Sequence, residues 1–309
     1  MIVVCGEALI DLTSSRTDPR RFDARPGGGP CNTAVGLGRL GVPTGFLGRL
    51  STDRFGDALR EHLRGAGVDL ARVVPTDDVS TLAVANIDPS GGAAYTFYAN
   101  GTADPGLTAD MLPRLDDSVR ALHFGTCALV FEPSGSTLEA LFHGERAAGT
   151  RFLALDPNVR IGLVSNVDAY RSRIERMIAA ADLVKVSDAD IEALWPGEPV
   201  VSRVAQLARS GPSVIVLTRG AEALTALRSN GASVSVPAAK ADVVDTIGAG
   251  DTVNAAMLAW LSTHDALSRA ALDGLSDDQA AEMLRFAARA AAITCSRPGA
   301  DPPWAAELA

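Results

Sequence analysis

The stretch "DTIGAGDTVNAAML", residues 245–258, joins a glycine-rich turn to a helix-forming run and carries the most specific pattern in the chain. Apolar residues recur at helical spacing from Val253 onward, which predicts a helix that begins near Asp251. Gly248, Ala249 and Gly250 leave backbone N–H groups bare at that helix start, and such an arrangement binds anions. The turn therefore predicts an anion site at a helix N-terminus.

Asp251 lies where those amides would attract an anion, so its carboxylate has two interpretations. It could cap the helix and complement the helix dipole. It could instead accept the proton of a hydroxyl that attacks a phosphoryl group held by the amides. The Gly-Ala-Gly run favours the second interpretation, because capping needs no stretch of bare backbone.

The rest of the chain predicts an α/β fold. Short apolar runs without alternation are typical of strands buried on both faces of a parallel sheet. They are "MIVVCG" (1–6), "ALHFG" (121–125), "RFLALDPN" (151–158), "DLVKVS" (182–187) and "SVIVLTRG" (213–220). Helical patterns over 167–181 and 276–295 lie between or after these runs. This alternation predicts an α/β sandwich around a central, mainly parallel sheet.

Residues 80–104 differ from this pattern, because their apolar residues alternate. Leu82 and Val84 share one face, and Tyr95 and Phe97 share another, around a "DPSGG" turn. We expect an antiparallel hairpin that forms an edge appendage or a flap over a site.

Composition excludes several classes of protein. The chain has 309 residues, of which 47% are hydrophobic and 21% charged, and its net charge of −9 argues against nucleic acid and anionic membranes as partners. No run approaches the roughly 20 apolar residues of a membrane span, and the N-terminus lacks the pattern of a signal peptide. Its four cysteines form no CxxC pair and are typical of reduced thiols. We therefore expect a cytoplasmic protein.

Two further glycine clusters have different interpretations. "GLGRLG" (36–41) matches the dinucleotide fingerprint, but it ends a helical pattern instead of following a strand, so we reject a nicotinamide dehydrogenase. The run Gly27–Gly29 before Asn32 could be a flexible helix entry or a close backbone approach to a small ligand. Asp11, just past the first strand, would suit sugar hydroxyls or form a turn.

Together these motifs resemble the PfkB or ribokinase-like carbohydrate kinases. The two family signatures are matched by "GGGPCNTAVGLGRLG" (27–41) and "DTIGAGDTVNA" (245–255), and the segments between them follow in the family's order. These segments are "FYANGTAD" (97–104), "LHFGTCAL" (122–129), "LDPNVR" (155–160), "VKVSDAD" (184–190) and "LTRGAEA" (217–223). Pro30, "HFG" and "DPNVR" look most like the fructokinase branch.

The resemblance implies one ribokinase-like domain over 1–309, a three-layer α/β/α sandwich with a small β lid made by residues 12–27 and 79–102. It also implies ATP- and Mg²⁺-dependent transfer of a phosphoryl group to a sugar's primary hydroxyl, with D-fructose converted to fructose 6-phosphate. A homodimer through the lid is a further implication.

The same resemblance assigns roles to single residues. Asp251 would be the general base, and the amides of Gly248, Ala249 and Gly250 would form the anion hole. The sugar would be bound by Asp11, Gly28, Gly29, Asn32, Phe97 and Arg160. ATP would be bound by Lys185, Ser187, Thr218, Arg219, Gly220 and Glu222. A monovalent cation, K⁺, would be held by Asp245 and by the carbonyl of Ile247.

Some positions depart from the family pattern. Val253 and Ala256 replace Phe and Gly and are interpreted as packing adjustments. Ala223 replaces the usual Gly of the nucleotide turn, and Ser187 and Asp190 replace the Asn and Glu with which ribokinases organise Mg²⁺. The alternatives are a 2-keto-3-deoxygluconate kinase, a ribokinase or a nucleoside kinase of the same fold, and a non-catalytic sugar- or nucleotide-binding protein.

Overall fold

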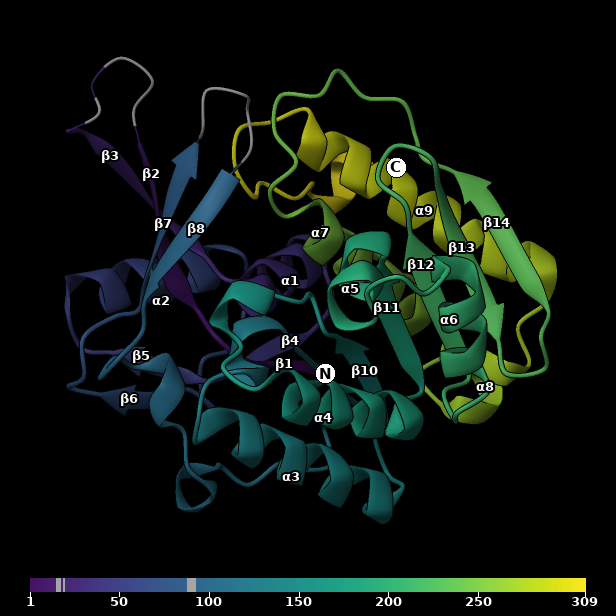
Figure 1. Cartoon of the computed structure of the whole chain (residues 1–309), viewed down its shortest axis with the longest axis horizontal. Coiled ribbons are helices and arrows are strands. Elements are labelled where there is room, and N and C mark those ends of the chain that lie inside the picture. Colours follow the sequence, from purple (N-terminus) through teal and green to yellow (C-terminus); the bar gives the residue numbers. More distant parts are fainter. Residues whose placement is uncertain (15–17, 19, 88–92) are drawn as a thin grey trace.

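A central eight-stranded sheet organises the computed structural model, which describes residues 1–14, 18, 20–87 and 93–309 (Figure 1). In spatial order its strands are β14 (Ser233–Pro237), β13 (Ala223–Arg228), β12 (Val214–Thr218), β11 (Leu183–Ser187), β10 (Phe152–Asp156), β9 (Ala121–Gly125), β1 (Ile2–Cys5) and β4 (Thr44–Leu47). The strands from β12 to β4 are parallel, and β13 and β14 add an antiparallel edge. The five strands predicted from apolar runs are all confirmed.

Helices cover both faces of this sheet and make three layers (Figure 1). Side chains of one face pack with α1 (Gly29–Arg39), α2 (Arg54–Gly65), α7 (Ala249–Thr263), α8 (Arg269–Asp273) and α9 (Asp277–Cys295). Those of the other face pack with α3 (Ser134–Ala148), α4 (Val167–Ala180), α5 (Asp188–Leu194) and α6 (Val200–Ala208). Successive residues of β1 alternate between the two cores, because side chains of a strand point to opposite faces. The predicted α/β/α sandwich is thereby confirmed.

The predicted helices are also present. Helix α4 buries Tyr170, Ile174 and Met177 on one face, as their spacing predicts. Helix α9 begins with a capping box between Ser276 and Gln279.

A second, four-stranded sheet projects from the sandwich (Figure 1). It consists of β3 (Phe22–Gly27), β2 (Leu9–Ser14), β7 (Leu82–Ile87) and β8 (Ala93–Tyr98), and we call it the lid sheet. The antiparallel pairing of β7 with β8 confirms the predicted hairpin, whereas its "DPSGG" turn lies outside the described residues. Asp11 is in register with Ala83, and Ala83 with Phe97, so these three residues share one face of the lid sheet. A separate pair of strands, β5 (Arg49–Ser51) and β6 (Val74–Thr76), completes the sheets.

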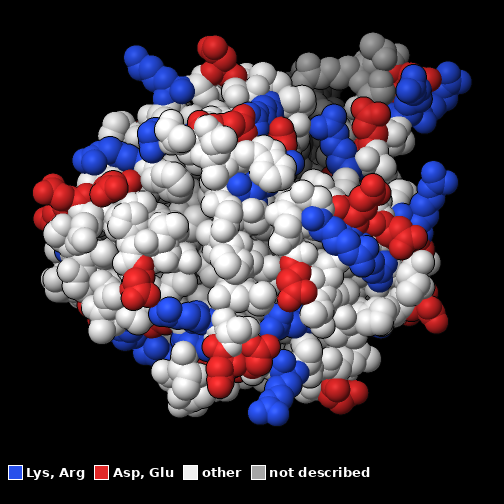
Figure 2. Space-filling view, turned by 180° about the vertical axis from the view of Figure 1, so that it is seen from behind, with Lys and Arg blue, Asp and Glu red and all other residues white. Residues whose placement is uncertain are grey.

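Acidic and basic side chains are interspersed over the face in Figure 2, which shows no extended basic surface there. No helix in the described part of the chain is long and apolar enough to cross a membrane. All four cysteines are free thiols.

Candidate active site

The candidate site lies at the carboxyl edge of the central sheet, where the N-terminus of α7 meets the lid sheet. Thr126 follows β9 and Asn158 follows β10, and both parallel strands end at this edge. Ligands of open α/β sheets commonly bind outside the carboxyl ends of the strands. The topology therefore gathers polar groups from distant parts of the chain.

The turn before α7 has the geometry of an anion site. Gly248 is the helix N-cap, with φ of 76° and no side-chain cap bond, so a residue free of Cβ suits this left-handed position. The N–H of Thr252 donates to Gly248 at 2.8 Å. The N–H of Ala249, which was predicted to be part of the anion hole, donates instead to the carbonyl of Thr246 at 3.3 Å. The N–H groups of Gly250 and Asp251 donate to no protein acceptor in the described part of the chain, and two free amides at a helix N-terminus favour an anion.

Asp251 does not cap α7 but lies inside the site. Its side chain is buried, with 7% exposed, and it accepts hydrogen bonds from Asn32 Nδ2 at 2.9 Å and from Asn158 Nδ2 at 3.4 Å. Burial raises the pKa of Asp251, while the Asn32 bond and the charges of Lys185 and Arg160 lower it. The carboxylate is oriented by two amides and partly desolvated, which is the environment of a general base.

Gly29 makes room for this group. A Cβ at Gly29 would collide with Thr126 Oγ1 and lie 3.2 Å from both Asn158 Nδ2 and Asp251 Oδ1. The backbone of 28–29 therefore approaches the carboxylate closely, as one interpretation of the glycine run predicted.

The lid sheet brings a second carboxylate to the site. Burial and the neighbouring charge of Asp251 raise the pKa of Asp11 to about 6, while Arg160 lowers it. Arg160 in turn donates to Asn158 Oδ1 at 2.7 Å. Phe97 lies on the same face of the lid sheet as Asp11. The residues predicted to bind sugar thus come from the lid sheet, from the start of α1 and from the loop after β10, and Asp11, Gly29, Asn32 and Arg160 lie around Asp251.

The residues predicted to bind ATP have two different environments. Lys185 is buried under α7 and paired with Asp156. Thr218, Arg219, Gly220 and Glu222 lie at the β12–β13 turn, where Arg219 pairs with Glu222 at 3.3 Å. Positive φ in this turn occurs at Gly220, whereas Ala223 begins β13 without it. An alanine at 223 therefore costs no backbone strain.

Ser187 and Asp190 form a capping box at the start of α5. Both oxygens of Asp190 accept hydrogen bonds, Oδ1 from the N–H of Val159 at 2.6 Å and Oδ2 from Ser187. These two residues hold α5 to the loop after β10, and Asp190 has no free oxygen that faces the site as an obvious metal ligand.

Asp245 links the glycine turn to the segment after α9. Its Oδ1 accepts from the N–H of Ile247 at 3.0 Å, and its Oδ2 accepts from the N–H of Gly299 at 2.8 Å. Gly248 packs against Ala300 so closely that a Cβ would not fit between them. The assignment of Asp245 and Ile247 to a monovalent cation stays a prediction.

Sequence reasoning missed Asn158, Asp156 and Asn254. Asp156 accepts from Lys185 Nζ at 3.0 Å and from Asn254 Nδ2 at 2.6 Å. Asn254 follows Asp251 by three residues, which places both on one face of α7. That spacing and the "DPN" after a predicted strand were signals that could have found all three.

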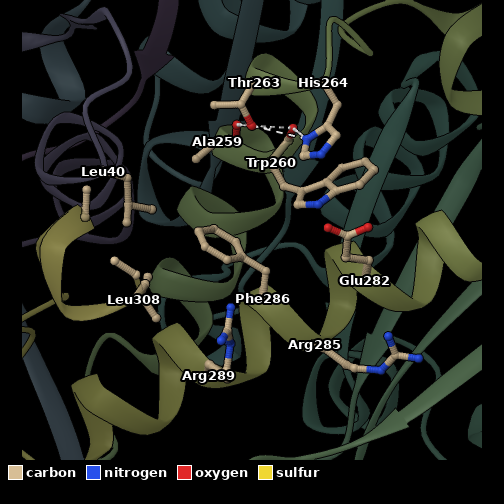
Figure 3. A pocket seen from close by; sticks show the side chains of 12 residues that line it. Leu40, Ala259, Trp260, Thr263, His264, Glu282, Arg285, Phe286, Arg289 and Leu308 are labelled. Carbon is tan, nitrogen blue, oxygen red and sulfur yellow. Dashed lines mark hydrogen bonds between the residues drawn. The ribbon is translucent and has the colours of Figure 1, made fainter.

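A cavity of about 570 Å³ lies elsewhere, at the C-terminal end of α7 (Figure 3). Trp260 stacks on His264 in its wall, and Phe286, Arg285 and Arg289 of α9 complete much of the lining. None of the predicted site residues lines it.

Free amides at a helix start, a buried carboxylate beside them and a lid sheet above are the parts of an enzyme that transfers a phosphoryl group to a hydroxyl. Comparison with known proteins agrees with this class. The model of the pfkB family carbohydrate kinases matches residues 1–307, and the chain belongs to this family.

Curated relatives include a fructokinase of Rhizobium leguminosarum bv. trifolii, 38% identical over 91% of this chain and 85% of its own length. A fructokinase of Klebsiella pneumoniae is 35% identical over 85% of each chain. Among solved structures, a fructokinase from Xylella fastidiosa with bound ATP superposes with a TM-score of 0.89, at 27% identity, over 99% of this chain and 97% of its own.

Proposed function

We propose that this carbohydrate kinase is a fructokinase, which transfers the γ-phosphoryl group of ATP to the primary hydroxyl of D-fructose and forms fructose 6-phosphate. Similarity to fructokinases over most of the chain supports the substrate. The observation that carries the chemistry is the carboxylate of Asp251, held by two asparagines beside two free amides.

Asp11 and Arg160 orient the sugar so that its hydroxyl lies against Asp251. The carboxylate of Asp251 takes the hydroxyl proton as the oxygen bonds to the γ-phosphorus. The bond from that phosphorus to the bridging oxygen of ADP breaks, and the electron pair leaves with ADP. The amides of Gly250 and Asp251 stabilise the charge on the transferred group throughout.

Mg²⁺ fits this site as part of its complex with ATP. No group of three or more His, Cys, Asp or Glu side chains able to hold a metal occurs in the described ranges. Mg²⁺ is usually held by substrate phosphates, water and few carboxylates, so it would neutralise phosphate charge here with little help from side chains. K⁺ at Asp245 and Ile247, a single domain over 1–309 and a cytoplasmic location also stay proposals.

The test is ADP release measured with D-fructose, 2-keto-3-deoxygluconate, D-ribose and a nucleoside as acceptors. We expect D-fructose to give the highest kcat/KM. We also expect Asp251→Asn to lose at least about 10²-fold in kcat, because general-base catalysis contributes that much or more.

Asp273→Asn, an exposed carboxylate in α8, is the matched control and keeps full activity. Near-full activity of Asp251→Asn would contradict the mechanism. A higher kcat/KM with another acceptor would replace fructose as the substrate. Sugar or ATP binding without turnover would support the binding-protein alternative.

A further inference from the structure

Lys185 lies directly beneath the anion hole. A Cβ at Gly250 would lie 2.9 Å from Lys185 Nζ and 3.5 Å from its Cε, and no atom of Asp156 lies within 4 Å of that point. Gly250 has no positive φ, so its backbone conformation does not require glycine. The absence of a Cβ at Gly250 instead leaves room for the ammonium group of Lys185 beside the backbone of the turn.

The ammonium group is held in place by a buried network. Lys185 is 4% exposed and donates to Asp156 at 3.0 Å and 3.2 Å, and Asp156 accepts from Asn254 at 2.6 Å. Burial works against the charge of Lys185, but Asp156 and the other nearby carboxylates raise its pKa overall. The lysine is therefore a cation, and its ammonium group lies closer to the Cβ position of Gly250 than any atom of Asp156 does.

A buried ion pair costs desolvation free energy and is weak evidence for stability by itself. A cation fixed under two free amides has a clear use, however, because preorganised charge in a water-poor site acts strongly on charge that develops in a transition state. We propose that Lys185 is the buried cation of the anion hole and stabilises the transferred phosphoryl group from below the Gly250 backbone, with Asp156 and Asn254 as positioning residues. This inference rests on the proposed function and replaces the ATP-binding role that the resemblance implied for Lys185.

Lys185 also acts on the general base. Four charged groups surround Asp251. Lys185 and Arg160 lower its pKa, and the charge of Asp251 in turn raises the pKa of Asp11 and of Asp156. Removal of the Lys185 charge therefore raises the pKa of Asp251. The acid limb of the kcat/KM profile is expected to move to higher pH.

The test compares Lys185→Met with the double variant Lys185→Met/Asp156→Asn. The single variant leaves a carboxyl group buried without its partner, whereas the double variant removes both charges and keeps an acceptor for Asn254. Arg146→Met is the matched control, because Arg146 pairs with the buried Asp182 at the other end of β11 at 3.0 Å.

We expect the folded double variant to lose about 10²-fold in kcat, as for one donor to a developing charge, with the KM for fructose nearly unchanged. We expect the acid limb to shift upward in Lys185→Met, which loses the cation alone. Arg146→Met keeps its kcat. Binding of ADP with aluminium fluoride, which mimics the transferred group, should weaken in the double variant, while binding of ADP alone should not.

Recovery of wild-type kcat in the double variant would show that Lys185 is only structural and would overturn the proposal. Equal weakening of ADP and of ADP with aluminium fluoride would assign Lys185 to nucleotide binding and also overturn it. If the wild type prefers another sugar, the proposed substrate is wrong. The wild type and the Lys185 variants are then compared with that sugar as the acceptor, and the same outcomes decide the role of Lys185.

Discussion

Two carboxylates of the site differ in environment and therefore in task. Asp251 is held by two asparagine amides and lies near two cations. Asp11 lies on the lid sheet, close to the charge of Asp251, and its pKa is raised to about 6. The raised pKa of Asp11 places its titration within the pH range of an assay.

We therefore predict that the KM for fructose rises as the pH falls through about 6, because protonated Asp11 accepts hydrogen bonds from sugar hydroxyls less strongly than the carboxylate does. Asp11→Asn should have a high KM that does not vary across this range. Initial-rate kinetics between pH 5 and 8 measure both effects, with Asp273→Asn as the control. A wild-type KM that is flat through pH 6 would exclude this role.

The raised pKa of Asp11 also predicts how the stability of the protein depends on pH. A carboxyl group whose folded pKa lies above the unfolded value of 3.8 lowers stability progressively as the pH rises from 3.8 to about 6, and the full loss is present above pH 6. Asp11→Asn should therefore have a higher Tm than the wild type above pH 6, and the difference should vanish below pH 3.8.

At the scale of elements, the contact between α1 and α7 sets the site. Asn32 of α1 reaches Asp251 of α7, and Thr33 Oγ1 donates to the carbonyl of Asp251 at 3.4 Å. One turn further along α1, a Cβ at Gly36 would lie 2.7 Å from the Cβ of Ala255. The glycine of the false dinucleotide fingerprint thus lets two helices approach closely.

We predict that Gly36→Ala lowers the free energy of unfolding by about 1–3 kcal/mol, the usual cost of overpacking a buried contact, and lowers kcat by moving Asn32 from Asp251. Urea unfolding and steady-state kinetics measure these effects. Gly144→Ala in α3 is the control, because a Cβ there meets nothing within 4 Å, and it should gain about 0.5–1 kcal/mol. Equal stability of the two variants would show that the contact between α1 and α7 accommodates an added methyl group without loss of stability.

At the scale of the whole molecule, the lid sheet has two unlike faces. One face carries Asp11 and Phe97 toward the site. The opposite face carries Phe22 and Tyr98 on the two edge strands, where they are 45% and 60% exposed, and Leu82 of β7, which packs against the core. Exposed large apolar side chains occur at interaction surfaces.

This face supports the predicted homodimer. Sedimentation velocity should find a dimer for the wild type and a monomer for Tyr98→Glu, since a charge there would be buried without a partner. Val201→Glu, which changes an exposed residue of α6, is the control and should remain dimeric. A monomeric wild type at micromolar concentration would contradict the prediction.

Local patterns predicted the fold well but the site only in part. The run at 121–125 became β9 with the same bounds, because a buried parallel strand requires a continuous apolar run. Asp251, Asn32 and Asp11 converge as the resemblance implied. The bonds from Asp156 to Lys185 and Asn254 span 29 and 98 residues. These hydrogen bonds depend on the order of the strands in the sheet, which no local sequence pattern predicts.

The bond between Asp245 and Gly299 has a consequence for synthesis of the enzyme. The turn that holds the anion is fastened by residues that follow α9, including Ala300 against Gly248. A nascent chain whose residues 299 and 300 are still inside the ribosome lacks this fastening, although its lid, central sheet and α7 are already made. Catalytic competence should therefore appear only once residues 299 and 300 have emerged and packed against the turn.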